Sequence, residues 1–175
     1  MRRMLILALL SLPMIACAVG FTPPTPGALY TEQPPGANVD GEQAVVTNVI
    51  DGDTIDVRIG ASTYRVRYIG INTPERDEVC YREAADANAA FVSGKTVTLV
   101  KDESNTDQYG RLLRYIYVDN IFVNEQLVLQ GYAEAVVYPP DTQYADYFTR
   151  LEQEAARFQR GCHPTGIFDD GSYTR

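Results

Sequence analysis

Three short segments between residues 51 and 111 bring acids and arginines together at close spacing. They read Asp-Gly-Asp-Thr at 51–54, Arg-Tyr-Ile-Gly-Ile-Asn-Thr-Pro-Glu at 67–75 and Thr-Asp-Gln-Tyr-Gly-Arg at 106–111. Carboxylate and amide oxygens are ligands of hard divalent cations, and arginines bind phosphate oxygens through paired N–H donors. A carboxylate after a proline turn, such as Glu75, can deprotonate a water molecule. Because water attacks a phosphodiester with the help of such groups, the three segments predict a phosphodiesterase site.

Several of these residues also have a purely structural interpretation. Asp51 and Asp53 flank a glycine, and an Asp-Gly pair is common in hairpin turns. Glu75 could be an acid near a helix N-terminus, where the helix dipole favours it. Arg111 could form a salt bridge at the rim of the molecule, and Asp107 could only brace its own loop. The order and spacing of all three segments together favour the chemical interpretation.

The charge of the chain bounds what it can bind. The 175 residues carry a formal net charge of −8, with a pI near 4.6, and the only lysines are Lys95 and Lys101. A protein that binds nucleic acid regardless of sequence normally has a basic face. The balance therefore argues against such a binder, but not against a catalyst that holds one or two phosphates with a few arginines. We expect weak long-range attraction of DNA, and a KM that rises with salt.

The elements that must position the site are predicted from hydrophobic periodicity and turn residues. Strands are expected at 43–50, 54–59, 63–71, 96–101 and 112–118, with a helix at 80–92 between the third and fourth. A second helix is expected from Asn124, as N-cap, to Gly131. A third runs from near Asp141 to Gly161, with core residues at helical spacing: Tyr144, Phe148, Leu151, Ala155 and Phe158. This order predicts an α+β fold, a five-stranded Greek-key barrel of the OB type with three helices.

The N-terminal segment predicts export. An apolar run from Leu5 to Leu12 follows two arginines, as in a signal peptide over residues 1–17, and is shorter than the roughly 20 residues of a transmembrane helix. Met-Ile-Ala-Cys at 14–17 predicts a lipoprotein with Cys17 as the lipidated residue. Cleavage after Ala18 would instead give a secreted or periplasmic protein, and an uncleaved anchor is the third alternative. Residues 18–41 form a proline-rich linker, 42–163 the folded domain and 164–175 a C-terminal tail.

Cysteine usage agrees with export. Once Cys17 is lipidated or removed, Cys80 and Cys162 remain as a pair, and an oxidising compartment favours a disulfide over two buried thiols. By the chain-entropy model, closing a loop of roughly 80 residues stabilises the fold by about 4–5 kcal/mol. A zinc site is not expected, because His163 is the only histidine and there is no Cys-x-x-Cys pair.

From about Gln43 to Cys162 the sequence resembles the staphylococcal nuclease (thermonuclease) family. The stretches that carry the resemblance are VIDGDTIDV, VRYIGINTPE, GKTVTL, TDQYGRLLRYIYVD and VNEQLVLQGYA, with the closing helix. The resemblance implies an OB-fold, calcium dependence, and hydrolysis of DNA and RNA to products that end in a 3′-phosphate. It also implies single-stranded or frayed DNA and RNA as substrates, and we expect a monomer.

The same resemblance assigns roles by motif position. Asp53 would bind calcium, Thr73 would offer its backbone carbonyl, and Asn72 stands where the family commonly has a second aspartate ligand. The site would thus carry one negative charge fewer, and calcium affinity should fall. By the same resemblance, Glu75 would be the general base, and Arg67 and Arg111 would bind the phosphate. Tyr109 and, with shifted spacing, Tyr138 would line the nucleotide pocket.

Two other functions remain open from the sequence. One is a catalytically inactive OB-fold module that binds nucleic acid, and the other is a purely structural lipoprotein. A binding module would not require Arg67, Glu75 and Arg111 together, so the nuclease is the favoured hypothesis.

Overall fold

The computed structural model describes residues 39–169 and residue 171. The predicted signal peptide, Cys17 and most of the predicted linker lie outside the described residues. Within residues 39–169, no helix is both long and apolar enough to cross a membrane.

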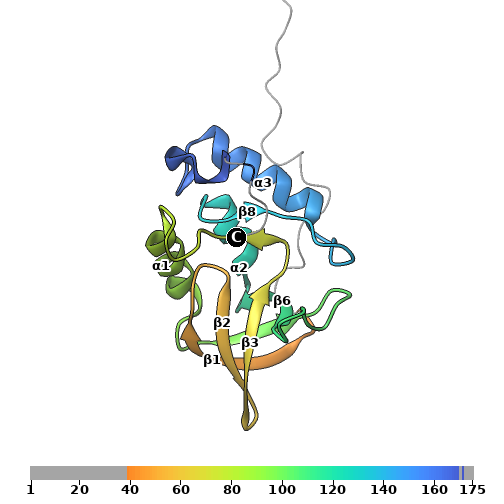
Figure 1. Cartoon of the computed structure of the whole chain (residues 1–175). Helices are drawn as coiled ribbons and strands as arrows, with labels where there is room; N and C mark the ends of the chain where they lie inside the picture. Colours follow the sequence, from red (N-terminus) through yellow and green to blue (C-terminus); the bar gives the residue numbers. More distant parts are fainter. Residues whose placement is uncertain (1–38, 170, 172–175) are drawn as a thin grey trace, which may run out of the picture. The chain divides into compact units, whose positions relative to one another are not determined.

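Five strands form the predicted barrel (Figure 1). Antiparallel pairs join β2 to β1 and β3, and β5 to β1 and β6, while a parallel pair between β3 and β6 closes the barrel. The short β7 extends the sheet beyond β6. The bounds of these strands are β1 Glu42–Val49, β2 Thr54–Ile59, β3 Ser62–Tyr68, β5 Thr96–Val100, β6 Leu112–Val118 and β7 Ile121–Phe122. The α+β fold and its five-stranded barrel are therefore confirmed.

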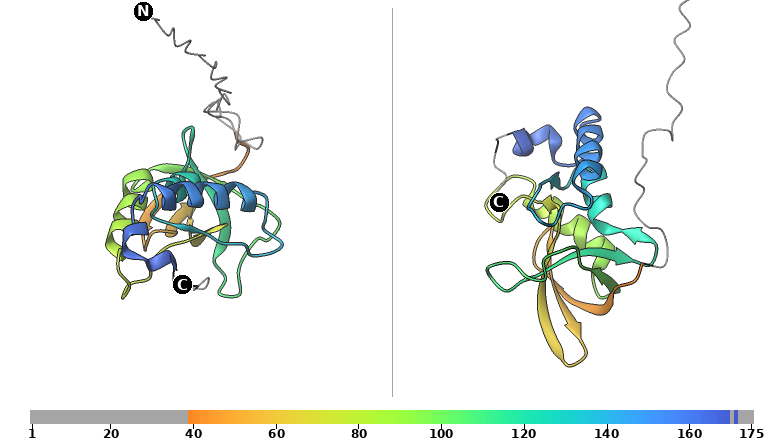
Figure 2. Two further views of the ribbon diagram at one scale, coloured as in Figure 1. Left: turned by 90° about the horizontal axis from the view of Figure 1, so that it is seen from above. Right: turned by 90° about the vertical axis from the view of Figure 1, so that its right-hand side faces the viewer.

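Three helices and a small second sheet complete the domain. The helices are α1 Tyr81–Val92, α2 Val123–Leu129 and α3 Ala145–Arg157. Strands β4 Ile71–Asn72 and β8 Glu134–Ala135 pair antiparallel. Two 3₁₀ turns, η1 His163–Thr165 and η2 Ile167–Asp169, follow α3. Figure 2 shows α3 over α2, at the opposite end of the domain from the β2–β3 hairpin.

The core fills the barrel and the space below α3. Strand residues such as Val57 and Val66 have no exposed surface. Between the barrel and α3, Tyr115 makes edge-on ring contacts with Phe122, Tyr144 and Phe148 at centroid distances of 5.8, 4.8 and 6.3 Å. Such aromatic pairs add to the stabilisation from apolar burial. The aromatic spacing of the last helix is thus core packing at Tyr144 and Phe148, as the sequence predicts.

Three predicted details of the helices are wrong. Asn124 is not an N-cap, since Phe122 holds that place and α2 begins at Val123. The Asn124 side chain is instead buried, where it accepts from the Ile116 N–H and donates to the Ile69 carbonyl, both at 2.9 Å. These two bonds satisfy backbone groups of β6 and of the turn between β3 and β4, which a sequence pattern does not reveal.

The other two corrections concern the last helix. It begins at Ala145 rather than near Asp141, because the Asp141 carboxylate is occupied in accepting the N–H groups of Glu103 and Ser104. Phe158, predicted in the core, is 59% exposed at the C-cap. Its ring lies under the guanidinium groups of Arg157 and Arg160, a contact that needs no burial.

A disulfide joins Cys80 and Cys162, as predicted. Cys80 is the residue before α1, and Cys162 precedes the first 3₁₀ turn after α3. The bond spans 82 residues and ties the start of the first helix to the end of the last.

Candidate active site

Asp53 is a buried carboxylate directly before β2, and it binds Thr73 of the second sequence segment. Its Oδ2 accepts from the backbone N–H and the hydroxyl of Thr73, both at 2.9 Å. Its Oδ1 accepts from the Thr54 hydroxyl at 3.0 Å and pairs with Arg67 Nε at 3.2 Å. Gly52 permits this approach, since a Cβ there would lie 2.7 Å from the Thr73 side chain. The first two sequence segments therefore meet at one carboxylate.

Asp51 adds a second carboxylate beside the first. Its Oδ1 accepts from the Asp53 N–H at 3.0 Å. Burial and the neighbouring charge of Asp53 raise the pKa of Asp51 to about 6, although that N–H and Arg67 oppose the shift. The side chain of Asn88 stabilises the turn at residues 51–53. It donates to the Asp51 carbonyl and accepts from the Tyr68 hydroxyl.

Arg67, at the end of β3, has each of its three guanidinium nitrogens bonded within the protein. Nη1 donates to the carbonyls of Tyr68 and Ile71 at 3.0 and 2.8 Å, and Nη2 donates to Asn72 Oδ1 at 2.9 Å. With the Nε contact to Asp53, these bonds hold a side chain that is only 10% exposed. Arg67 is therefore both part of the site and part of the fold.

Glu134 is a site neighbour that the sequence analysis missed. Strand β8 pairs Glu134 directly opposite Asn72 of β4, and Asn72 Nδ2 donates to Glu134 Oε1 at 3.0 Å. Both residues are buried. The available signal was a single acid in the apolar run at 132–138. A pairing of two-residue strands 62 positions apart gives no sequence period that would have placed it.

Glu75 follows Pro74 in a turn between β4 and α1. Its side chain is exposed, and its backbone N–H donates to Glu78 Oε2 at 2.7 Å. The interpretation of Glu75 as a helix N-terminal acid is wrong, because α1 begins only at Tyr81 and has Glu83 in its first turn.

The third segment is a loop organised by Asp107. Its Oδ1 accepts from the backbone N–H groups of Tyr109 and Arg111 at 2.9 Å, and its Oδ2 pairs with Arg111 Nε. Burial opposes ionisation of Asp107, but the hydrogen bonds from Arg111 and Tyr109 outweigh it and lower the pKa. The structure thus shows the Arg111 salt bridge and the loop brace that the sequence allowed. The Arg111 side chain remains 30% exposed, and its Cζ lies 5.5 Å from the centre of the Tyr109 ring.

Both arginines line one cleft of about 740 Å³. The cleft brings together, among others, Arg67, Asp107, Tyr109, Arg111, Tyr138 and Asp141. Tyr109 and Tyr138 are 75% and 47% exposed, so their rings can meet a ligand. Asp53, Asn72, Thr73 and Glu75 do not line this cleft, and Arg67 is the residue that connects it to the carboxylates.

The oxygen donors around Asp53 fit a hard cation. Carboxylates of Asp53 and Asp51 and the oxygens of Thr73 lie together, and all are ligand types that calcium accepts. Two of the four contacts to Asp53 come from hydroxyls, which can rotate and leave the carboxylate to a cation. Asn72 Oδ1 already accepts from Arg67. Residues 39–169 contain no group of three or more His, Cys, Asp or Glu side chains placed to bind a metal.

Comparison with known families agrees with this arrangement. The profile of the staphylococcal nuclease homologue family matches residues 65–162, from β3 to the second cysteine of the disulfide. The chain belongs to this family. The match begins after Asp53 and includes the other seven predicted positions of the nuclease site: Arg67, Asn72, Thr73, Glu75, Tyr109, Arg111 and Tyr138.

Individual relatives show similarity over comparable lengths. The endonuclease YncB of Bacillus subtilis (strain 168) is 38% identical over 138 residues, which are 71% of this chain and 65% of the relative. The SPbeta prophage-derived endonuclease YokF of the same organism is 40% identical over 114 residues, 61% of this chain and 38% of the relative. The thermonuclease of Staphylococcus intermedius is 32% identical over 128 residues, 70% and 76% of the two chains. The chain thus spans less than two thirds of the two Bacillus relatives.

Proposed function

We propose that the protein is a nuclease that hydrolyses phosphodiester bonds of single-stranded or frayed DNA and RNA. The observation that carries the proposal is the cleft in which Arg67 and Arg111, from segments 44 positions apart, lie with two exposed tyrosines. Arginines suit the planar, paired recognition of phosphate oxygens, and tyrosine rings stack on bases of any sequence. Membership of the nuclease family supports the same activity.

Each residue of the proposed site has a separate role in hydrolysis. Arg111, and Arg67 through the one Nη2 N–H that Asn72 does not use, donate to the non-bridging phosphate oxygens, where charge develops in the transition state. Glu75 accepts the proton of the water that attacks phosphorus, and the bond from phosphorus to the 5′-oxygen breaks. The 5′-oxygen takes up a proton from solvent and leaves as a hydroxyl, and the phosphate stays on the 3′-oxygen. Thr73 is hydrogen-bonded to Asp53, and Glu75 follows Thr73 by two residues. The backbone that carries Glu75 is therefore anchored at the buried carboxylate. A calcium ion held by Asp53, Thr73 and Asn72, with Asp51, would supply Lewis acidity at the phosphate.

The test compares cleavage of labelled single-stranded DNA and RNA by the parent protein and by Glu75→Gln, in calcium, in magnesium and with chelator. We expect calcium-dependent cleavage by the parent and a loss of at least about 100-fold in kcat for Glu75→Gln. Glu83→Gln, which removes the same charge from the exposed face of α1, is the matched control and should cleave like the parent.

Arg111→Ala is the better arginine variant. Arg111 is partly exposed, whereas Arg67 makes buried bonds whose loss would also disturb the fold. We expect a decrease of about 100- to 1,000-fold in kcat. Cleavage by Glu75→Gln at the parental rate would contradict the mechanism. Tight binding of oligonucleotide by a parent that cleaves nothing would identify the inactive binding module instead.

We also propose that the protein is exported and anchored through lipid on Cys17. The N-terminal pattern described above supports this proposal. Cys17→Ala should move the protein from the membrane fraction to the soluble fraction of expressing cells and abolish labelling by a fatty-acid probe. Equal fractionation of variant and parent would contradict lipidation.

A further inference from the structure

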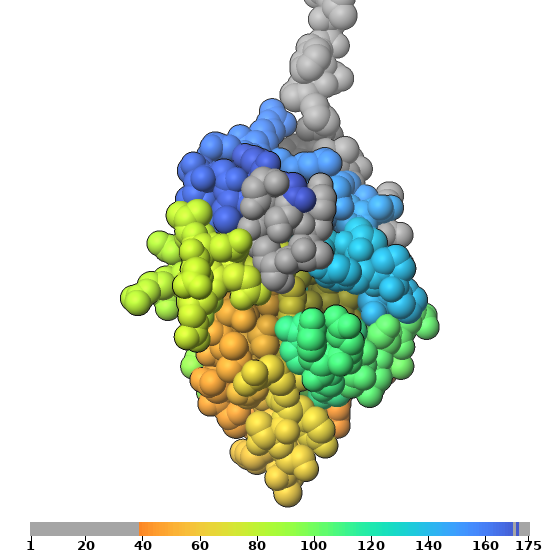
Figure 3. Space-filling view, viewed as in Figure 1, coloured from red at the N-terminus to blue at the C-terminus, as the bar shows by residue number. Residues whose placement is uncertain are grey.

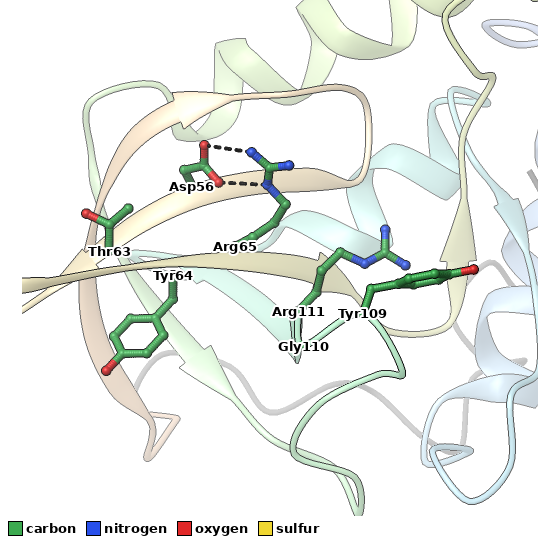
Figure 4. Close-up of a pocket in the computed structure, with 7 residues that line it drawn as sticks. All are labelled: Asp56, Thr63, Tyr64, Arg65, Tyr109, Gly110 and Arg111. Carbon is green, nitrogen blue, oxygen red and sulfur yellow. Dashed lines mark hydrogen bonds and ion pairs between the residues drawn. The ribbon is translucent and has the colours of Figure 1, made fainter.

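A second hollow lies beside the cleft and shares two residues with it. It has a volume of about 520 Å³ and is bounded by the β2–β3 hairpin on one side and by the loop at 109–111 on the other (Figure 4). Tyr109 and Arg111 line both spaces. Figure 3 shows the loop, in green, directly beside the hairpin, in yellow and orange.

Arg65 is the cation that this hollow adds. Because side chains alternate along a strand, Arg65 and Arg67 share one face of β3, about 6.6 Å apart along the strand. That distance is similar to the spacing of neighbouring phosphates in an extended single strand. Figure 4 shows the guanidinium groups of Arg65 and Arg111 on the same side of β3, with Tyr64 pointing to the other side.

Asp56 holds Arg65 in place. The Asp56 carboxylate, opposite Arg65 in the strand register, accepts from Nε at 2.9 Å and from Nη2 at 3.3 Å. The side chain of Arg65 is still 51% exposed. The Nη1 side of the guanidinium is left for a ligand, and its direction is fixed before binding, which reduces the entropy lost on association.

We propose that this hollow is a second phosphate subsite, in which Arg65 binds the phosphodiester adjacent to the one held by Arg67 and Arg111. The proposal rests on the proposed nuclease function and extends it to the length of strand that the protein recognises. Because Arg65 is paired with Asp56, which also lines the hollow, the subsite acts through the Nη1 donors of Arg65 and not through a net positive charge. Tyr109 lines both spaces and offers its exposed ring to the base of the nucleoside between the two phosphates.

The experiment measures kcat/KM of the purified full-length protein on two single-stranded DNA substrates. One is a dinucleotide with a single phosphodiester, and the other is an octanucleotide. For Arg65→Ala we expect the octanucleotide-to-dinucleotide ratio of kcat/KM to fall about 10-fold, as for the loss of one charge-assisted hydrogen bond. The matched control is Arg58→Ala, which removes an exposed arginine from the same hairpin outside the hollow and should leave the ratio as in the parent.

Two outcomes would overturn the subsite. The first is an unchanged ratio in Arg65→Ala, and the second is an equal fall of the ratio in Arg58→Ala, which would indicate only a general charge effect. If the parent cleaves neither substrate, the nuclease proposal fails separately. The subsite is then tested by the dissociation constants of the two fluorescently labelled oligonucleotides. Arg65→Ala should reduce the preference for the octanucleotide over the dinucleotide, and Arg58→Ala should leave it unchanged.

Discussion

The amide of Asn72 lies between an arginine and a carboxylate, and both of its ends are used. Its oxygen accepts from Arg67 and its nitrogen donates to Glu134. An aspartate at this position would keep the first contact but place a second buried carboxylate against Glu134, whose Oε1 is 3.0 Å from the present Asn72 nitrogen. Two buried like charges at such a distance destabilise the folded state unless one binds a proton or a cation. The neutral residue at 72 is therefore explained by the acid at 134.

This pairing predicts the result of a double-mutant cycle. Asn72→Asp should lower the free energy of unfolding by about 1–3 kcal/mol, since it removes a buried donor and adds a charge. Combining it with Glu134→Gln should restore most of the loss, because the glutamine amide can donate to the new carboxylate. Urea unfolding without metal measures both effects, and calorimetric titration should show that the double variant binds calcium more tightly than the parent. Additive losses in the double variant would show that residues 72 and 134 are not coupled.

At the scale of elements, the features that depend on local sequence patterns, above all the positions of the strands, could be predicted. Alternating strand residues and glycine turns located the five barrel strands to within a few residues. The third strand, expected to run to residue 71, ends at Tyr68. Gly70 turns the chain there with φ of 76°, and a Cβ on it would lie 2.8 Å from the Phe148 ring of α3. That constraint comes from an element 78 positions away, so no local pattern contains it.

The site follows the same division. Arg67, Tyr109, Arg111 and Tyr138 were predicted from motif positions and share one cleft. Glu134 was missed because only the pairing of β4 with β8 brings it to Asn72. Residues whose role depends on a motif could be found in the sequence, and residues whose role depends on a distant pairing could not.

The contact of α3 with β8 gives a pH-dependent prediction. Burial, followed by the charges of Glu134 and Asp169, raises the pKa of Glu152 above its ordinary value of 4.5, although the Ala135 N–H opposes this. The folded state thus binds the Glu152 proton more strongly than the unfolded state, and stability falls as the pH rises from about 4.5 through the folded pKa. Glu152→Gln resembles the protonated form and can still accept from Ala135.

We therefore expect Glu152→Gln to raise the melting temperature at pH 7 by about 1–3 °C, and to leave it unchanged at pH 4. Thermal unfolding followed by circular dichroism measures the difference. Glu154→Gln, on the same helix, loses an ion pair with Arg160 at 2.9 Å and should give no gain at either pH. A gain for Glu152→Gln that is equal at pH 4 and pH 7 would exclude ionisation as its cause.

For the whole molecule, the disulfide is the connection with the largest expected effect on stability. It joins the residue before α1 to the segment after α3, so 82 positions of chain, including β5, β6 and α2, lie between its ends. The bond also fixes the far end of the segment that runs from Thr73 through Glu75 to Cys80. Its near end is held by the Thr73 contacts to Asp53. The cross-link therefore acts on the stability of the domain and on the anchoring of the proposed base.

Replacing both cysteines, Cys80→Ser with Cys162→Ser, should lower the free energy of unfolding by about 4–5 kcal/mol, because the unfolded chain regains the entropy of a loop of this length. Guanidinium unfolding of the parent with reductant should give a similar loss, and reductant should have no effect on the double variant, which controls for Cys17. Below the melting temperature, kcat should fall less than in Glu75→Gln, since the base remains. A double variant as stable as the parent would show that helix packing, and not the cross-link, holds the two ends of the domain together.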